Sequence, residues 1–134
     1  MTKWIVIRWS GVLLLLAVLI GGIFYESNLV KTSLNGAKEY CYQIEIAAQN
    51  NGGIVNGEVA SLVDNMQSYW DKKESQLCFF TNYKSIEQLG IEIVRLKTYI
   101  DEEEEIEFFT SLEIIKHYTE NFEYFVGSNI HNIL

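Results

Sequence analysis

Glu113, His117 and Glu120 have the residue types and spacing that come closest to a chemical site. They lie four and three residues apart, so a helix would place them on one face, where carboxylates and an imidazole can bind a metal ion. Di-iron helical bundles use Glu-x-x-His motifs on paired helices, and the sequence has no matching second motif. We therefore predict no metal site, no cofactor and no catalytic residues.

A second candidate is the acidic run Glu102 to Glu105, because hard cations prefer several carboxylate oxygens. On a helix, however, consecutive side chains point about 100° apart and do not converge on one ion. The run also lacks the spacing of an EF-hand loop. We interpret it as the solvated first turn of a helix, where the helix dipole favours negative charge, and leave ion binding by residues 101–107 open.

The two cysteines, Cys41 and Cys78, are too few for a disulfide framework and lack the spacing of a zinc site. Antiparallel neighbouring helices could bring them together, and an extracytoplasmic location would permit a disulfide between them. The alternative, which the sequence favours, is that both are small buried thiols. Neither is predicted to be a nucleophile, because the sequence places no histidine to activate it.

The aromatic residues Phe79, Phe80 and Tyr83 lie in a stretch with more apolar side chains than one buried stripe needs. We predict that these three residues form an exposed patch on which a partner docks.

Beyond residue 25, apolar residues recur at helical spacing, which predicts an all-α fold. The first stripe runs from Leu34 to Ala48, and the sequence Asn50 to Gly53 is typical of a helix end. A second helix begins near Asn56 or Gly57, with Trp70 at the edge of its stripe, and either kinks or restarts near residues 81–85. A third begins at the acidic cluster, with Asp101 as its cap. The predicted stripes are Leu34, Ala37, Cys41, Ile44 and Ala48; Val59, Leu62, Met66, Tyr69 and Leu77; Ile86, Leu89, Ile93, Leu96 and Ile100; and Phe108, Leu112, Ile115, Phe122 and Val126.

The N-terminal residues form an apolar segment. Ten residues between Gly11 and Phe24 are Leu, Ile, Val or Phe, which together favour membrane insertion by about 3 to 6 kcal/mol. The stretch from Trp4 to Tyr25 would make about 33 Å of helix, enough to span a hydrocarbon core of about 30 Å. Arg8 lies near one end, where its guanidinium can reach the headgroups. A cleaved signal peptide is the alternative, but no small-x-small cleavage site follows.

The predicted architecture is a transmembrane anchor over residues 1–25 and an antiparallel bundle of three long helices over residues 26–134. The first bundle helix can be continuous with the anchor. Lys3 and Arg8 favour a cytoplasmic N-terminus, which places the bundle outside the cytoplasmic membrane. All 18 acidic residues and 8 of the 10 basic ones follow residue 25, so that part carries a net charge of −10. This charge argues against a nucleic-acid partner.

Three segments resemble an uncharacterised family of small single-span membrane proteins, a domain of unknown function found in spore-forming clostridia and bacilli. The segments are Trp70-Asp71-Lys72-Lys73 with Leu77, Gln88-Leu89 with Arg95 to Ile100 before an acidic stretch, and Asn132-Ile133-Leu134. Tyr83 stands where the family often has a histidine, so no histidine role carries over. The resemblance implies a multi-span YetF-like membrane protein as partner, and a link to sporulation.

The leading interpretation is a membrane-anchored, non-enzymatic helical accessory protein whose acidic domain binds another protein. Self-association into a homo-oligomer stays open. The alternative is an extracytoplasmic sensory domain that admits a small ligand between its helices.

Overall fold

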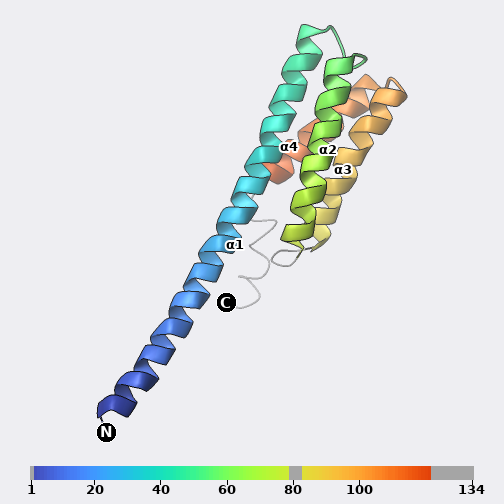
Figure 1. Cartoon of the computed structure of the whole chain (residues 1–134). Coiled ribbons are helices and arrows are strands. Elements are labelled where there is room, and N and C mark those ends of the chain that lie inside the picture. Colours follow the sequence, from blue (N-terminus) through green and yellow to red (C-terminus); the bar gives the residue numbers. More distant parts are fainter. Residues whose placement is uncertain (1, 79–82, 122–134) are drawn as a thin grey trace.

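The computed structural model describes residues 2–78 and 83–121, and the regular elements in these ranges are all helices. α1 spans Thr2–Asn50, α2 spans Gly57–Leu77, α3 spans Tyr83–Asp101 and α4 spans Glu105–Glu120. α1 is one unbroken helix of 49 residues, which confirms that the apolar segment can continue into the first bundle helix. Its C-terminal half packs against the other helices, whereas its N-terminal half extends away from them (Figure 1).

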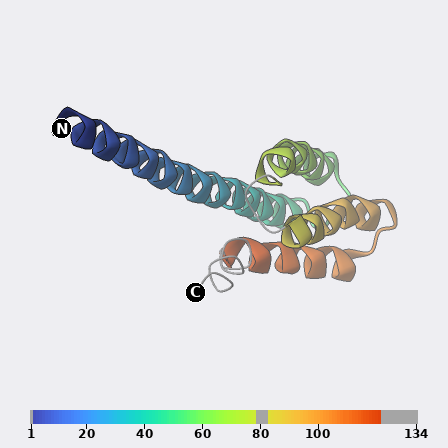
Figure 2. The same cartoon turned by 90° about the horizontal axis from the view of Figure 1, so that it is seen from below.

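The helices contact one another in a ring, because α1 and α3 each pack against both α2 and α4. Consecutive helices run in opposite directions (Figure 1), and α2 and α4 lie on opposite sides of α1 and α3 (Figure 2). We call residues 26–121 the bundle. α2 ends at Leu77 and a separate antiparallel helix, α3, begins at Tyr83, so the prediction of three long bundle helices was wrong. Of the two alternatives near residues 81–85, a kink and a restart, the structure has the restart. The sequence between Leu77 and Tyr83 holds neither glycine nor proline to mark the reversal.

The faces that meet inside the bundle carry apolar stripes, and most of the predicted members are buried. Leu62 and Tyr69 of α2 and Ile100 of α3 are only partly buried, and in α2 Val63 and Trp70 are buried instead. Leu34, Ala37, Cys41, Ile44 and Ala48 of α1 are all buried. The core is completed by Val59, Val63, Met66, Trp70 and Leu77 of α2, by Ile86, Leu89, Ile93 and Leu96 of α3, and by Phe108, Leu112 and Ile115 of α4. Phe122 and Val126 of the predicted last stripe lie outside the described residues.

The turn between α1 and α2 follows from its sequence. Gly52 and Gly53 have φ angles of 73° and 152°, a left-handed region that side chains disfavour, and the Gly53 amide donates to the Ala48 carbonyl at 2.9 Å. Asn56 caps α2, since its Oδ1 atom accepts a hydrogen bond from the Val59 amide at 2.9 Å. Both predicted helix boundaries are confirmed.

The turn between α3 and α4 differs from the prediction. Asp101 is the last residue of α3 instead of the cap of the next helix, and Glu104 occupies the N-cap position of α4 without a side-chain hydrogen bond. Glu103 adopts a left-handed φ of 57°, and the Glu104 amide donates to the Tyr99 carbonyl at 2.9 Å. The backbone therefore satisfies the end of α3, and Glu102 to Glu105 are exposed at the turn.

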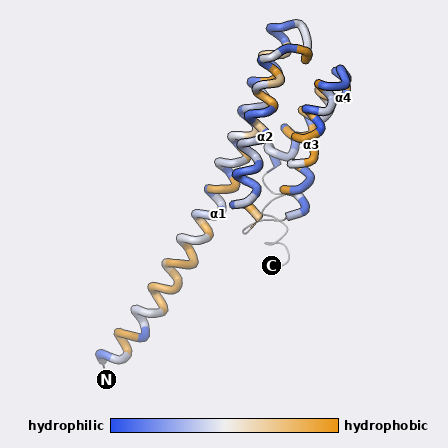
Figure 3. The backbone as a smooth tube through the Cα atoms, turned by 45° about the vertical axis from the view of Figure 1, so that its right-hand side comes forward, coloured by the Kyte–Doolittle hydropathy of each residue, from blue (hydrophilic) through white to orange (hydrophobic). Residues whose placement is uncertain are grey.

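The N-terminal half of α1, from Trp4 to Tyr25, is exposed along its whole length and strongly apolar (Figure 3). We call it the apolar half of α1. Within the described residues, α1 alone is long and apolar enough to cross a membrane, and none of its most apolar window is buried by the protein. Length and composition make it a candidate span, and a signal sequence would meet the same test.

Candidate interaction surface

Trp70 of α2 lies against Gly90 of α3. Trp70 is 1% exposed, so it lies in the core and not at the edge of the α2 stripe as predicted. A Cβ atom on Gly90 would lie 3.4 Å from the indole Nε1 atom, which is ordinary van der Waals contact, so Gly90 lies directly against the ring. Nε1 is buried and has no hydrogen-bond partner among the residues that the structure describes. The indole edge therefore underlies a surface position on α3 that carries no side chain.

Above this contact lies a groove of about 370 Å³ between α2 and α3, which we call the α2–α3 groove. Its apolar residues come from α3, where Tyr83, Ile91 and Val94 are 58%, 39% and 50% exposed. Positions 83, 87, 91 and 94 are separated by three or four residues, so they share one face of α3. Solvent-exposed apolar side chains in line with polar ones are typical of a protein-binding surface.

Carboxylates surround this apolar strip. Asp71 and Glu74 of α2 and Glu87 of α3 line the groove, and none of them has an ion-pair partner among the described residues. Partial burial raises the pKa of Glu74, and the negative charges of Asp71 and Glu87 raise it further. The crowding of like charges makes the groove attractive to a cation.

Arg95 is the basic residue of the groove, but its charge is already engaged. Its Nη1 atom donates to Glu92 Oε1 at 2.6 Å. Glu92 is buried, with 6% exposed, and its other oxygen accepts from Ser111 Oγ of α4 at 2.9 Å. This network ties α3 to α4, and within residues 2–78 and 83–121 no positive charge pairs with the three groove carboxylates. The hydrogen-bond network of Arg95, Glu92 and Ser111 was not predicted from the sequence, because Glu92 and Ser111 are 19 residues apart and lie on two helices.

Tyr83 is the described member of the predicted docking patch, and the structure places it in the α2–α3 groove. Phe79 and Phe80 lie outside the described residues. The sequence analysis missed Asp71, Glu74, Ile91 and Val94. The exposed apolar positions Ile91 and Val94, on the face opposite the buried stripe of α3, were the available signal.

The two cysteines are free thiols and are not brought together. Cys41 is buried nine residues before the end of α1, about 13 Å of helix, whereas Cys78 is exposed after the 21 residues of α2, about 31 Å of helix. Because α2 runs back along α1, they are about 18 Å apart along the bundle, beyond the ~7 Å between Cα atoms that a disulfide allows. Burial raises the pKa of the Cys41 thiol to about 12. The exposure of Cys78 contradicts the prediction that both thiols are buried.

The residues with metal-ligand spacing contact other side chains. Glu113 pairs with Lys116 at 3.2 Å, Glu120 pairs with Lys38 at 3.5 Å, and His117 Nδ1 lies 3.3 Å from Asn121 Nδ2. Among residues 2–78 and 83–121, no group of three or more His, Cys, Asp or Glu side chains could hold a metal ion.

Lys116 of α4 makes polar contacts with α1 that were not predicted from the sequence. Its ammonium group forms ion pairs with Glu45 of α1 and with Glu113, and it lies 5.0 Å from the ring centroid of Tyr42. Desolvation lowers the pKa of Lys116, but the hydrogen bonds and charges of Glu45 and Glu113 outweigh it, so the pKa is raised overall. Lys116 therefore stays charged and holds α4 against α1.

Fold and surface together define an all-helical protein with a candidate membrane span and an open acidic groove. Residues 24–133 match the model of a family described as a domain of unknown function (DUF4363), and the chain belongs to this family. The match covers the bundle, so the membrane assignment depends on the composition of α1. No curated protein and no solved structure matches the chain.

Proposed function

We propose that this protein is a membrane-anchored, non-enzymatic accessory protein that binds a protein partner through the α2–α3 groove. The partner element is a basic amphipathic helix, whose apolar side chains would contact Tyr83, Ile91 and Val94. The observation that carries the proposal is the line of exposed apolar residues on α3, bordered by three carboxylates that have no ion-pair partner in the described part of the chain. Lysine or arginine on the partner would neutralise those carboxylates.

The apolar half of α1 supports the membrane part of the proposal. Its exposed apolar side chains favour insertion by about 3 to 6 kcal/mol, and no part of the described protein covers them. With a cytoplasmic N-terminus, the bundle would lie outside the cytoplasmic membrane. A multi-span YetF-like partner and a role in sporulation, both implied by the resemblance, stay predictions.

The sensory alternative needs a cavity between the helices that a small ligand can fill. In the described part of the bundle the facing stripes are filled by buried apolar side chains, and the hollows found there are open grooves at the surface. These observations favour the protein-binding function.

Site-specific photo-crosslinking in intact membranes tests the proposed surface. A photoreactive amino acid at Ile91 should crosslink one discrete partner, whereas the same probe at Ile106, which is 80% exposed at the start of α4, should not. Crosslinking of equal strength at both positions, or none at Ile91, would contradict the proposal.

Charge variants show whether the carboxylates select that partner. The double variant Glu74→Gln and Glu87→Gln should reduce the Ile91 crosslink severalfold, because two of the three groove carboxylates are lost. The variant Glu102→Gln and Glu103→Gln removes the same charge at the α3–α4 turn and should leave the crosslink unchanged. Equal loss in both variants would show that only the net charge of the domain matters.

A further inference from the structure

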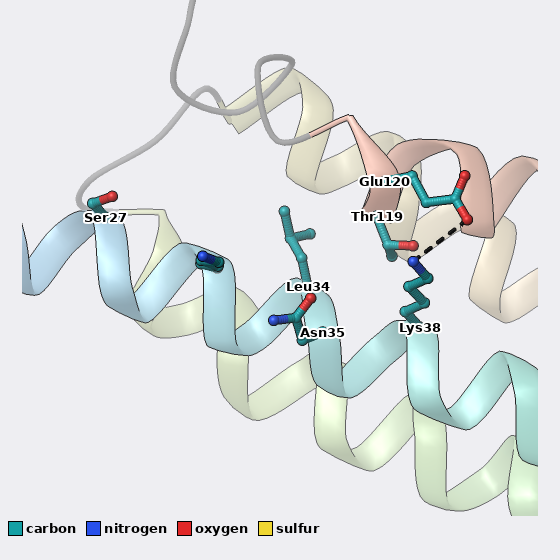
Figure 4. A pocket seen from close by; sticks show the side chains of 7 residues that line it. Ser27, Leu34, Asn35, Lys38, Thr119 and Glu120 are labelled. Atoms are coloured by element: carbon teal, nitrogen blue, oxygen red, sulfur yellow. Dashed lines mark ion pairs between the residues drawn. The ribbon is translucent and has the colours of Figure 1, made fainter.

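A second groove, of about 470 Å³, lies between α1 and the end of α4 (Figure 4). We call it the α1–α4 groove. Ser27, Lys31 and Asn35 of α1 line it at intervals of four residues, so they share one helical face. Leu34 points toward α4 and is 1% exposed, which gives the groove an apolar base. The hydroxyl, ammonium and amide groups of this face are all hydrogen-bond donors.

The charged residues that line the α1–α4 groove are Lys31, Lys38 and Glu120, so their net charge is positive, whereas the bundle as a whole is negative. Lys38 is paired with Glu120 at 3.5 Å, and its Nζ atom also lies 6.0 Å from the ring centroid of Tyr42. Lys31 is exposed and has neither an ion pair nor a hydrogen bond among the described residues. Within the described residues, the groove therefore holds a positive charge without a partner, while the chain after residue 25 carries −10 in total. Such a group attracts an anion that also accepts hydrogen bonds.

The distance of the α1–α4 groove from the apolar half of α1 follows from helix geometry. Lys31 follows Tyr25 by six residues, which is about 9 Å of helix, and Ser27 follows it by about 3 Å. A lipid headgroup layer extends about 5 to 8 Å beyond the hydrocarbon core. With the apolar half of α1 in a bilayer, Ser27 and Lys31 would border the layer that contains the lipid phosphates.

We infer that the α1–α4 groove binds a phosphate-bearing anion, with the Lys31 ammonium as its charge partner and Ser27 and Asn35 as neutral donors. The phosphate comes from the headgroup of an anionic lipid or from free phosphate. The lipid source depends on the membrane anchor of the proposed function, whereas the anion site itself does not. It is also independent of the partner helix, because the α2–α3 groove shares no residue with it.

Titration calorimetry on the full chain in a non-ionic detergent tests this inference with three probes. The probes are short-chain phosphatidylglycerol, short-chain phosphatidylcholine and inorganic phosphate. The wild-type chain should bind phosphatidylglycerol or phosphate saturably, and Lys31→Gln should weaken that binding about tenfold or more, because a charge-assisted hydrogen bond is lost. Lys72→Gln removes an exposed lysine of α2 and should leave binding unchanged.

The probes also separate the two sources. Binding of phosphatidylglycerol with no binding of phosphate identifies the headgroup, and equal binding of both identifies the free anion. Three results would overturn the inference. They are phosphatidylcholine binding as tight as that of phosphatidylglycerol, a Lys31→Gln affinity equal to that of the wild type, and no saturable binding of any probe. Circular dichroism on each variant shows whether the helices are intact. The Glu74→Gln and Glu87→Gln variant should keep wild-type phosphate binding, so failure of the partner site and failure of the anion site are distinguishable.

Discussion

The two halves of α1 belong to the same helix but have opposite surroundings. In the apolar half every side chain from Trp4 to Tyr25 is exposed, whether apolar or not. In the bundle half, residues 26–50, the buried positions repeat every three or four residues and charged side chains occupy the other faces. Most apolar residues of the second half are thus buried because neighbouring helices cover one face, whereas no described part of the protein covers those of the first half.

The comparison indicates that the two halves of α1 require different surroundings. Apolar side chains on all sides of a helix are stable only when something apolar surrounds them, and a lipid bilayer provides this where no protein does. A helix with one apolar stripe needs only neighbouring helices on that side. The halves should therefore respond differently to the same substitution.

The largest effect is expected from the paired substitutions Ile44→Ala and Ile20→Ala. Ile44 is fully buried in the bundle, so its truncation leaves a cavity and should lower the free energy of unfolding by about 2 to 5 kcal/mol. Ile20 is 53% exposed in the apolar half, and the same truncation should leave the unfolding of the bundle unchanged. Denaturant unfolding of both variants in detergent measures the difference, and equal destabilisation would show that the halves do not differ.

The second pair of variants introduces a positive charge into each half of α1. Leu15→Arg puts a guanidinium near the middle of the apolar half and should cost about 2.5 to 3.5 kcal/mol of membrane insertion. Ile46→Arg puts the same group at a position that is 56% exposed on the bundle half and should not affect insertion. The fraction of each variant retained in membranes measures this difference. Similar retention of Leu15→Arg and the wild type would contradict a membrane-spanning segment.

A smaller effect is expected at the junction between α1 and α2. Asn56→Ala removes the side-chain acceptor for the Val59 amide and should destabilise the bundle by about 1 kcal/mol. Asn56→Ser keeps an acceptor oxygen and should retain most of the stability. Thermal unfolding of the pair measures the effect, and equal melting temperatures of Asn56→Ala and the wild type would show that the cap contributes nothing.

The smallest effect is expected from Glu74→Gln. The pKa of Glu74 is raised in the folded protein, so the folded state holds this proton more tightly and stability falls as the pH rises through that pKa. The neutral glutamine should therefore stabilise the bundle near neutral pH by about 0.5 kcal/mol or less, because solvent screens the charge. The gain should vanish in acid, where Glu74 is itself protonated. A gain that persists or grows in acid would contradict this origin.

The helices themselves could be predicted from the sequence, because a buried stripe needs apolar residues every three or four positions. Leu34 to Ala48 and Ile86 to Leu96 show that pattern, and Asn56 has the side chain that a helix cap requires. The sequence does not distinguish a kink from a reversal between α2 and α3, since Cys78 to Asn82 contain neither glycine nor proline.

The two grooves could not be predicted, because each depends on how two helices are rotated against each other. Gly90 contacts Trp70 only because α2 and α3 are packed with these two positions facing each other. Among the described residues Lys31 has no ion-pair partner, and Glu120, the last residue of α4, pairs with Lys38, which is seven residues further along α1. Spacing along one helix contains no information about either relation.

The most direct test of the account is alkaline extraction of membranes from cells that express the full chain. The account predicts that the protein stays in the membrane pellet after extraction and enters solution only with detergent, because the apolar half of α1 is surrounded by lipid. Recovery of the intact chain in the aqueous fraction without detergent would contradict it.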